Sequence, residues 1–231
     1  MAPPNESSSA EVRVAEFGGV VVAGFGVAVV LLYLFAWLAN EVLEQETYSL
    51  DAATLASIDR FSSPRLTLLA EGISQLGSLV IFILAGALLV VFLWQRRWGA
   101  ALTLILVTAG AQVLNDLLKG LFQRTRPEPL TGLIDVQQYS FPSGHAMVAA
   151  AFYLYVAYLC WRLVRGWWRG ALVAGLVLLV LLIGLARLYL GVHYLSDVIA
   201  GYLAGFVWTL AVILAGIIPA ARPRRAGMSL S

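Results

Sequence analysis

The 231-residue sequence contains few charged residues, a single cysteine and only two histidines. Charged residues make up 12% of the chain and hydrophobic residues 61%, against roughly 25% and 45–50% in soluble domains. This imbalance excludes an ordinary soluble domain, and it also excludes disorder, which requires low hydrophobicity. The lone Cys160 cannot form an internal disulfide. A net charge of +2 is too small to indicate nucleic acid as a partner.

Runs without Asp, Glu, Lys or Arg recur along the chain and are long enough to cross a bilayer. A membrane helix needs about 20 mostly apolar residues and pairs all of its backbone polar groups internally. The runs do not alternate polar and apolar residues, as the strands of a membrane barrel would. The sequence therefore predicts an all-α, polytopic membrane protein with six transmembrane helices, over Phe17–Asn40, Gly72–Gln95, Trp98–Asn115, Ala146–Trp161, Gly170–Ala186 and Val198–Ala221.

These helices would form one membrane domain over residues 17–221, flanked by two tails. Residues 1–16 carry Pro, Ser, Asn and acidic residues and are expected to be a disordered tail. Residues 222–231 are expected to form a short basic tail. Gly201 and Gly205 in the last span have the spacing that permits close helix packing, within the chain or between chains.

The long acidic loop over residues 41–71 contains two helix signals. Ser63 followed by Pro64 is typical of a helix start, so the second helix is expected to begin before the membrane. Leu55 and Ile58 share a helical spacing with Phe61. That spacing fits either a short helix lying on the membrane surface or an ordinary packed loop.

The basic residues fall unevenly on the two sides of a six-span topology. Loops rich in Lys and Arg stay in the cytoplasm. The arginine-rich side of the bundle and both chain termini are therefore expected on the cytoplasmic side of the cell membrane. The nine basic residues on the predicted cytoplasmic side are Arg13, Arg96, Arg97, Arg162, Arg165, Arg169, Arg222, Arg224 and Arg225.

Four further basic residues, Lys119, Arg124, Arg126 and Arg187, lie near the opposite, outer ends of the predicted spans. A charge at mid-bilayer costs about 2.5–3.5 kcal/mol on insertion scales, so such charges are rare and usually functional. Any one of them could be a side chain that reaches back to the interface. Their convergence on one membrane face is what indicates a site.

Both histidines reach the same outer face. The fourth predicted helix begins there, after a Pro-Ser-Gly-His sequence that ends at His145. The sixth begins there too, with His193 and Asp197 at its start. Segments that are far apart in the sequence therefore bring their polar residues to one extracytoplasmic site.

The residue types at this site favour an anion. Lys119, Arg126 and Arg187 supply three positive charges, and arginine suits phosphate because its donors are planar. Ser143 is a predicted N-cap, and the following N–H groups would point at an anion from the helix start. Gly144 allows the backbone to approach a ligand closely. The same cations would repel a metal ion, so no metal and no cofactor are expected.

The spacing of His193 and Asp197 places both side chains on one helix face. A carboxylate that accepts from one imidazole nitrogen leaves the other with an exposed lone pair, as in an activated nucleophile. We therefore expect His193 to attack phosphorus, with Asp197 orienting it. His145 would give a proton to the leaving oxygen and then activate water. The cations and the helix N-terminus would stabilise the phosphoryl oxygens.

Together these stretches resemble the signature of the type 2 phosphatidic acid phosphatase superfamily. Its first motif, Lys, six residues, Arg-Pro, is matched from Lys119 to Pro127, and its second by Pro142–His145. The third motif, usually Ser-Arg, five residues, His, three residues, Asp, departs only at Ala186, where serine is usual. The resemblance implies a six-helix bundle like that of the related haloperoxidases, and metal-independent hydrolysis through a phosphohistidine.

A site at the outer helix ends could receive a phosphate headgroup while the lipid tails stay in the bilayer. The candidate substrates are phosphatidylglycerophosphate, phosphatidic acid and undecaprenyl pyrophosphate. Two alternatives remain: a lipid phosphotransferase that uses the same site, and a non-catalytic lipid or anion transporter. Arg124 could touch a second phosphate or glycerol, but contact with solvent is the preferred interpretation. Asp116 is expected to pair with a basic residue. The oligomeric state is left open.

Overall fold

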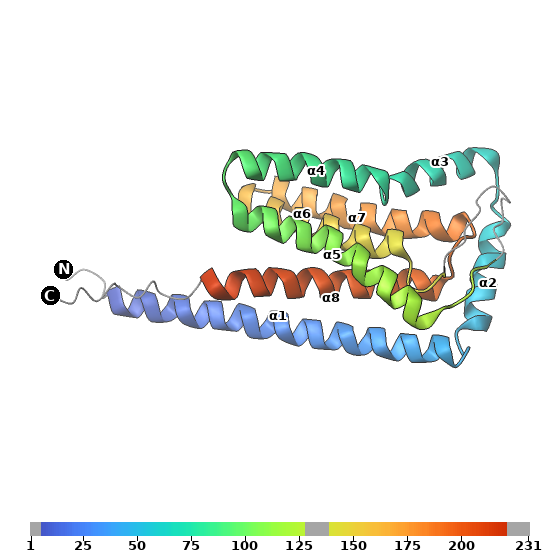
Figure 1. Cartoon of the computed structure of the whole chain (residues 1–231), viewed down its shortest axis with the longest axis horizontal. Helices are drawn as coiled ribbons and strands as arrows, with labels where there is room; N and C mark the ends of the chain where they lie inside the picture. The colour runs from blue at the N-terminus through green and yellow to red at the C-terminus, as the bar shows by residue number, and fades with distance from the viewer. Residues whose placement is uncertain (1–5, 128–138, 221–231) are drawn as a thin grey trace.

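A computed structural model of the protein describes residues 6–127 and 139–220. The described residues form helices connected by short turns, and they contain no strand. Figure 1 shows the long helices lying side by side in a bundle. The eight helices of the described part are α1 (Glu6–Leu43), α2 (Tyr48–Asp59), α3 (Pro64–Gln75), α4 (Leu79–Trp94), α5 (Trp98–Phe122), α6 (Gly144–Leu163), α7 (Trp168–Tyr189) and α8 (Leu195–Ala220).

The predicted all-α fold with six membrane spans is confirmed. Six segments of the described chain are long and apolar enough to cross a bilayer. Much of their surface consists of exposed large apolar side chains, which a helix bundle in lipid presents to the acyl chains. The six segments are Val21–Leu43, Pro64–Trp94, Trp98–Phe122, Gly144–Leu163, Trp168–Tyr189 and Leu195–Gly216.

The second span differs from the uninterrupted helix expected over residues 72–95. α3 does begin early, at Pro64, with Ser63 as its N-cap, as the sequence predicted. The helix then stops at Gln75 and restarts at Leu79. Gly77 lies in this break, and a Cβ there would be 2.5 Å from Cγ2 of Ile183 on α7. The break therefore lets the chain approach α7 closely. The uninterrupted apolar sequence of this span does not predict such a break.

α6 is the central helix, and its first half is almost entirely buried. Small residues allow α8 to pack directly on it: a Cβ at Gly201 would be 2.7 Å from the carbonyl oxygen of Ser143. A Cβ at Gly205 would collide with the carbonyl oxygen of Met147. The two glycines thus serve packing within the chain, the first of the two possibilities that their spacing left open.

Two parts of the bundle lie outside the six spans. α2 crosses the end of the bundle at the right of Figure 1, so the loop does contain a short helix over its Leu55 and Ile58. α1 begins at Glu6, so residues 6–16 continue the first membrane helix, and the expectation of a disordered tail is wrong for them. Their Ala, Glu and Arg are good helix formers. Residues 1–5 and 222–231 lie outside the described residues.

Candidate active site

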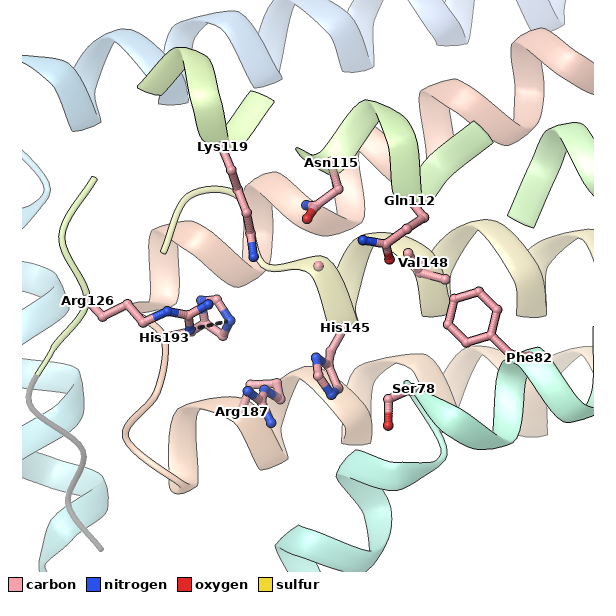
Figure 2. Close-up of a pocket in the computed structure, with 12 residues that line it drawn as sticks. Ser78, Phe82, Gln112, Asn115, Lys119, Arg126, His145, Val148, Arg187 and His193 are labelled. Atoms are coloured by element: carbon pink, nitrogen blue, oxygen red, sulfur yellow. Dashed lines mark hydrogen bonds between the residues drawn. The ribbon is translucent and has the colours of Figure 1, made fainter. Parts of the chain in front are cut away.

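A cavity of about 230 Å³ opens where α5 and α7 end and α6 begins. Figure 2 shows side chains from these helices and from the break between α3 and α4 pointing toward one space. Six of the eight residues predicted for the site line this cavity: Lys119, Arg126, Gly144, His145, Arg187 and His193. The remaining lining residues are Gly77, Ser78, Phe82, Gln112, Asn115 and Val148.

The two predicted residues that do not line the cavity lie directly behind it. Asp197 faces Nδ1 of His193 with Oδ2 at 3.4 Å, and Ser143 caps α6. The backbone N–H of Ser143 donates to the backbone carbonyl of Asp197 at 2.9 Å. This bond joins the start of α6 to the start of α8, so both histidine-bearing segments are fixed to each other.

The His193 ring lies between the guanidinium of Arg126 and the carboxylate of Asp197. Its Nε2 accepts a hydrogen bond from Nη1 of Arg126 at 3.1 Å, which places the ring hydrogen on Nδ1, toward Asp197. Asp197 is held in turn by the backbone N–H of Tyr194, which donates to Oδ2 at 2.9 Å. Burial, reinforced by Arg126 and Arg187, lowers the pKa of His193 to about 4, although Asp197 acts in the opposite direction. The ring is therefore neutral at pH 7, with a lone pair on Nε2.

The start of α6 has the geometry expected for an anion-binding helix N-terminus. Oγ of Ser143 accepts from the N–H of Ala146 at 3.5 Å, and Gly144 lines the cavity. Asn115 of α5 supports this turn, because its Nδ2 donates to the carbonyl oxygen of Pro142 at 3.2 Å. A Cβ at residue 144 would be 2.8 Å from Oδ1 of Asn115. Glycine is thus the residue that lets α5 and the turn meet here.

Arg187 is buried beside the cavity, and one of its nitrogens donates a hydrogen bond within the protein while another has no partner. Its Nη1 donates to Oγ of Ser74 at 2.8 Å, across from α3. Its Nε is buried and has no hydrogen-bond partner. Buried donors are nearly always satisfied, so this unpartnered guanidinium N–H, on a residue that lines the cavity, suits an oxyanion ligand.

Arg124 corrects the preferred interpretation from the sequence, which was contact with solvent. Its guanidinium donates to Oδ1 of Asp197 at 2.7 Å and to Oδ2 of Asp51 at 2.8 Å. It also lies over the ring of Tyr194, 4.3 Å from the ring centroid. Burial alone would lower the pKa of Arg124, but Asp197 and Asp51 raise it. Arg124 is thus an internal partner of the site and not a surface group.

Sequence reasoning missed three contributing residues. Ser74 and Asp51 lie in a span and in an acidic loop, where nothing in the local pattern distinguishes them from their neighbours. Ser196 donates to Asp51 from both its backbone N–H and its hydroxyl. Asp116 accepts from Nε2 of Gln112 at 3.0 and 3.1 Å, and its charge also acts on Lys119, the kind of basic partner expected from the sequence.

In residues 6–127 and 139–220, no three His, Cys, Asp or Glu side chains gather into a group that could hold a metal ion. Instead, the donors that surround the cavity are cationic or neutral. Independence from a metal or other cofactor stays a prediction, which the assay proposed below addresses directly.

A family model described as the PAP2 superfamily matches residues 100–216, just over half of the chain. The chain belongs to the PAP2 superfamily. The matched region runs from α5 through α8 and includes all three motifs found in the sequence. The resemblance inferred from those motifs, and with it the assignment to the PAP2-type lipid phosphatases, is confirmed.

Individual relatives are similar over most of this domain. Phosphatidylglycerophosphatase B of Bacillus subtilis is 31% identical over 187 residues, which is 77% of this chain and 88% of that protein. An undecaprenyl-diphosphatase of Sulfolobus acidocaldarius is 31% identical over 140 residues, covering 58% of this chain and 62% of that one. The crystal structure of a transmembrane PAP2-type phosphatidylglycerolphosphate phosphatase from B. subtilis superposes with a TM-score of 0.73 at 28% identity, over 86% of this chain and 98% of the other.

Proposed function

We propose that this PAP2 protein hydrolyses the terminal phosphate of a membrane lipid through a phosphohistidine on His193. The observation that carries the proposal is the arrangement around Nε2 of His193. This nitrogen bears a lone pair at a cavity that is also lined by His145, Lys119 and Arg187. A carboxylate stands behind the ring and cations stand in front of it, which is the arrangement needed to transfer a phosphoryl group to nitrogen.

In the first step, Nε2 of His193 attacks phosphorus and the bond between phosphorus and the lipid oxygen breaks. His145, on the first turn of α6, gives a proton to that oxygen, and the lipid leaves as an alcohol. Nε of Arg187 and the N–H groups at the start of α6 are placed to bind the equatorial oxygens, where negative charge is concentrated. Nη1 of Arg126 would leave Nε2 and follow the phosphate.

In the second step, water attacks the phosphohistidine. His145, now neutral, accepts a proton from the water while the bond between Nε2 and phosphorus breaks. Inorganic phosphate leaves, and His193 is neutral again with its hydrogen on Nδ1. Asp197 stabilises the ring while it carries positive charge as the phosphorylated imidazole. Each group thereby returns to its starting state.

The cavity supports a lipid phosphate whose tails stay outside it. Its volume of about 230 Å³ is smaller than the roughly 300–1,000 Å³ typical of pockets that enclose a drug-sized ligand. The headgroup therefore fits, and the acyl chains do not. Phe82 and Val148 give the cavity an apolar side. We favour phosphatidylglycerophosphate, because the relative that acts on it by name aligns over most of its length. Undecaprenyl pyrophosphate is the second candidate.

The proposed orientation places the active site on the extracytoplasmic side of the cell membrane. Arg96 and Arg97 between α4 and α5 lie at the end of the bundle away from the cavity, as do the arginines between α6 and α7. Loops with such an excess of arginine remain in the cytoplasm. The site would then open to the outer leaflet.

The test is phosphate release by the purified protein in detergent with EDTA present. We expect inorganic phosphate from dioctanoyl phosphatidylglycerophosphate, inhibition by vanadate, and loss of release in His193→Ala. Comparing rates on phosphatidic acid and undecaprenyl pyrophosphate assigns the substrate. Full activity of His193→Ala, or activity that requires an added metal, would refute the proposed mechanism.

A further inference from the structure

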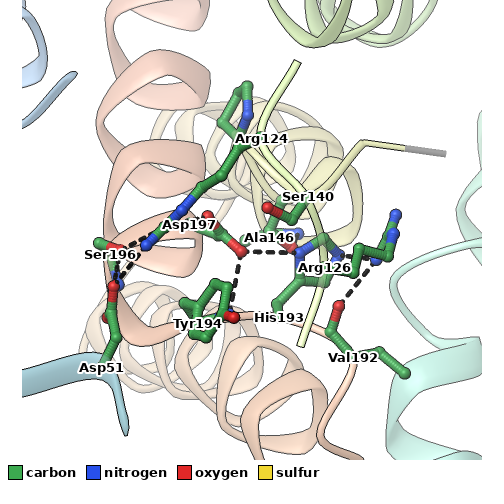
Figure 3. Close-up of polar contacts among 12 residues, drawn as sticks. Asp51, Arg124, Arg126, Ser140, Ala146, Val192, His193, Tyr194, Ser196 and Asp197 are labelled. Carbon is green, nitrogen blue, oxygen red and sulfur yellow. Dashed lines mark hydrogen bonds and ion pairs between the residues drawn. The ribbon is translucent and has the colours of Figure 1, made fainter. Parts of the chain in front are cut away.

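Asp197 is a partner of two basic side chains, and only one of them belongs to the reaction described above. Its Oδ2 faces His193 and its Oδ1 accepts from Nη1 of Arg124 at 2.7 Å. Asp197 is fully buried, and the side chain of Arg124 is 14% exposed. Figure 3 shows Arg124 reaching Asp197 on the side of the carboxylate away from His193. The nucleophile's carboxylate is therefore itself held in place.

The second anchor of Arg124 comes from outside the membrane helices. Nη2 of Arg124 donates at 2.8 Å to Oδ2 of Asp51, a fully buried residue on α2. Asp51 also accepts from the backbone N–H of Ser196 at 3.0 Å, so it binds the first turn of α8, which carries Asp197. Nη1 of Arg124 donates to Oγ of Ser196 at 2.7 Å as well. Helix α2, the loop after α5 and the start of α8 are thus joined through one guanidinium.

The charges of this network determine what Arg124 can do. Two buried carboxylates share one guanidinium, and an unpaired buried charge is strongly unfavourable. Nη1 is directed at Asp197 and Ser196, Nη2 is directed at Asp51, and the guanidinium plane lies over the Tyr194 ring. Arg124 does not line the cavity. Both terminal nitrogens of Arg124 are therefore bound by protein groups outside the cavity.

We infer that Arg124 is a positioning residue for the His193–Asp197 pair, and that Asp51 of the surface helix α2 anchors it. The inference rests on the proposed function. Without Arg124, Oδ1 of Asp197 has no cationic partner and the carboxylate is free to turn away from Nδ1 of His193. The imidazole then loses both its fixed orientation and the support of its positive charge in the transition state. Substrate binding, which uses other cations, is not affected.

The experiment compares kcat and KM of purified variants on two short-chain lipids. In dioctanoyl phosphatidylglycerophosphate, a phosphodiester and a second glycerol separate the diacylglycerol from the terminal phosphate. In dioctanoyl phosphatidic acid, the single phosphate is attached directly to the diacylglycerol. Because a misplacement of about 1 Å can cost 100-fold in rate, we expect Arg124→Met to lower kcat by about that factor on both lipids. KM should change less than about threefold.

Graded variants separate positioning from folding. Arg124→Lys keeps one point charge but cannot bind both carboxylates in a fork, so its kcat should lie between those of wild type and Arg124→Met. Asp51→Asn leaves Arg124 paired with Asp197, so its kcat should fall less than in Arg124→Met. Arg65→Met, an exposed arginine at the same end of the bundle, is the matched control and should behave as wild type. If Arg124→Met does not fold, the Lys and Asn variants decide the question.

Three results would overturn the inference. The first is a wild-type kcat in Arg124→Met. If that variant does not fold, the equivalent result is a wild-type kcat in both Arg124→Lys and Asp51→Asn, measured on stably folded protein. The second is a rise in KM at constant kcat, which would make Arg124 a substrate ligand. The third is a loss confined to phosphatidylglycerophosphate, which would assign Arg124 to the glycerol or a second phosphate. An inactive wild type would instead refute the proposed function, and the positioning role with it.

Discussion

Nη1 of Arg126 lies 3.1 Å from Nε2 of His193, so this nitrogen, the proposed nucleophile, accepts a hydrogen bond. An arginine cannot accept a hydrogen bond, so Nε2 carries the lone pair and Nδ1 the hydrogen. The resting ring is therefore already in the tautomer that attack on phosphorus requires. Arg126 also donates to the backbone carbonyl of Val192 at 2.8 Å, which holds it beside the ring.

The protonation state of His193 can be measured directly, because the chain has only two histidines. In the His145→Gln variant, made without a histidine tag, His193 gives the single histidine signal in a ¹⁵N NMR titration. Burial lowers the pKa of His193 to about 4, so we expect a neutral ring with hydrogen on Nδ1 down to about pH 5, and protonation only below that. A midpoint near the ordinary value of about 6.5 would contradict this environment.

An Asp197→Asn variant provides the control for that titration. Asp197 stabilises the protonated ring and so raises the pKa of His193 against the effect of burial. Removing its charge should move the midpoint below that of the parent. The same variant should lose most of its phosphate release, because the ring then lacks its orienting carboxylate. An upward shift of the midpoint would mean that Asp197 does not act on His193.

Ser74 is predicted to orient Arg187, although it lies outside the three motifs. Its hydroxyl accepts from Nη1 at 2.8 Å, and a hydrogen bond to a charged group contributes about 1.5–3 kcal/mol. We expect Ser74→Ala to lower kcat/KM for lipid phosphate about tenfold or more, as measured by phosphate release. Ser57→Ala, whose hydroxyl bonds only to the backbone carbonyl of Ala53 one turn earlier, should have no effect. Equal activities of the two variants would exclude Ser74 from the site.

Ala186, where the family pattern has serine, should tolerate that serine. The residue is 4% exposed and packs beside Ala70, Leu190 and Val192. In a helix, a serine hydroxyl can bond the carbonyl oxygen four residues earlier, so Ala186→Ser need not leave a buried hydroxyl unpaired. We expect its turnover to stay within about threefold of wild type in the same assay. A large gain in turnover would mean that the departure from the family pattern at Ala186 matters for the reaction.

The sequence revealed the parts of this protein whose physical signal is local. Long apolar runs predicted the six spans, since lipid imposes both their length and their composition. The motif residues from Lys119 to Asp197 were recognised because unusual charges gathered at one end of those spans. The start of α3 at Pro64 was predicted from a capping pattern of two residues.

The remainder depended on contacts between segments that carry no local mark. Asp51 is one acidic residue among several in an acidic loop, and only the fold shows that it is buried against Arg124. At Gly77, the space that a side chain would need is occupied by Ile183, more than 100 residues later in the sequence. Such pairings arise from tertiary packing, so composition and periodicity could not predict them.

The proposed membrane topology can be tested because the two ends of the bundle differ. The cavity lies at one end, and the loop with Arg96 and Arg97 lies at the other. Reporter proteins fused after Gly216 and inserted in the 95–97 turn should both indicate the cytoplasm. An epitope in the turn before α2, around Glu46, should be accessible from outside in intact cells. Labelling of both turns from one side would contradict the six-span arrangement.

Two glycines of the second span should respond oppositely to alanine. A Cβ at Gly77 would lie 2.5 Å from Cγ2 of Ile183 and 3.6 Å from Cβ of His145, whereas one at Gly86 on α4 would meet open space. Overpacking typically costs about 1–3 kcal/mol, so Gly77→Ala should lower the Tm in detergent by several degrees. It should also lower kcat, because relief of the contact moves α7 or the break away from the cavity. Gly86→Ala gains helix propensity and should match or exceed the wild-type Tm with unchanged kcat. If Gly77→Ala behaved like Gly86→Ala, the break would have no part in shaping the cavity beside His145. The close approach of α3 and α4 to α7 would then not be required for activity.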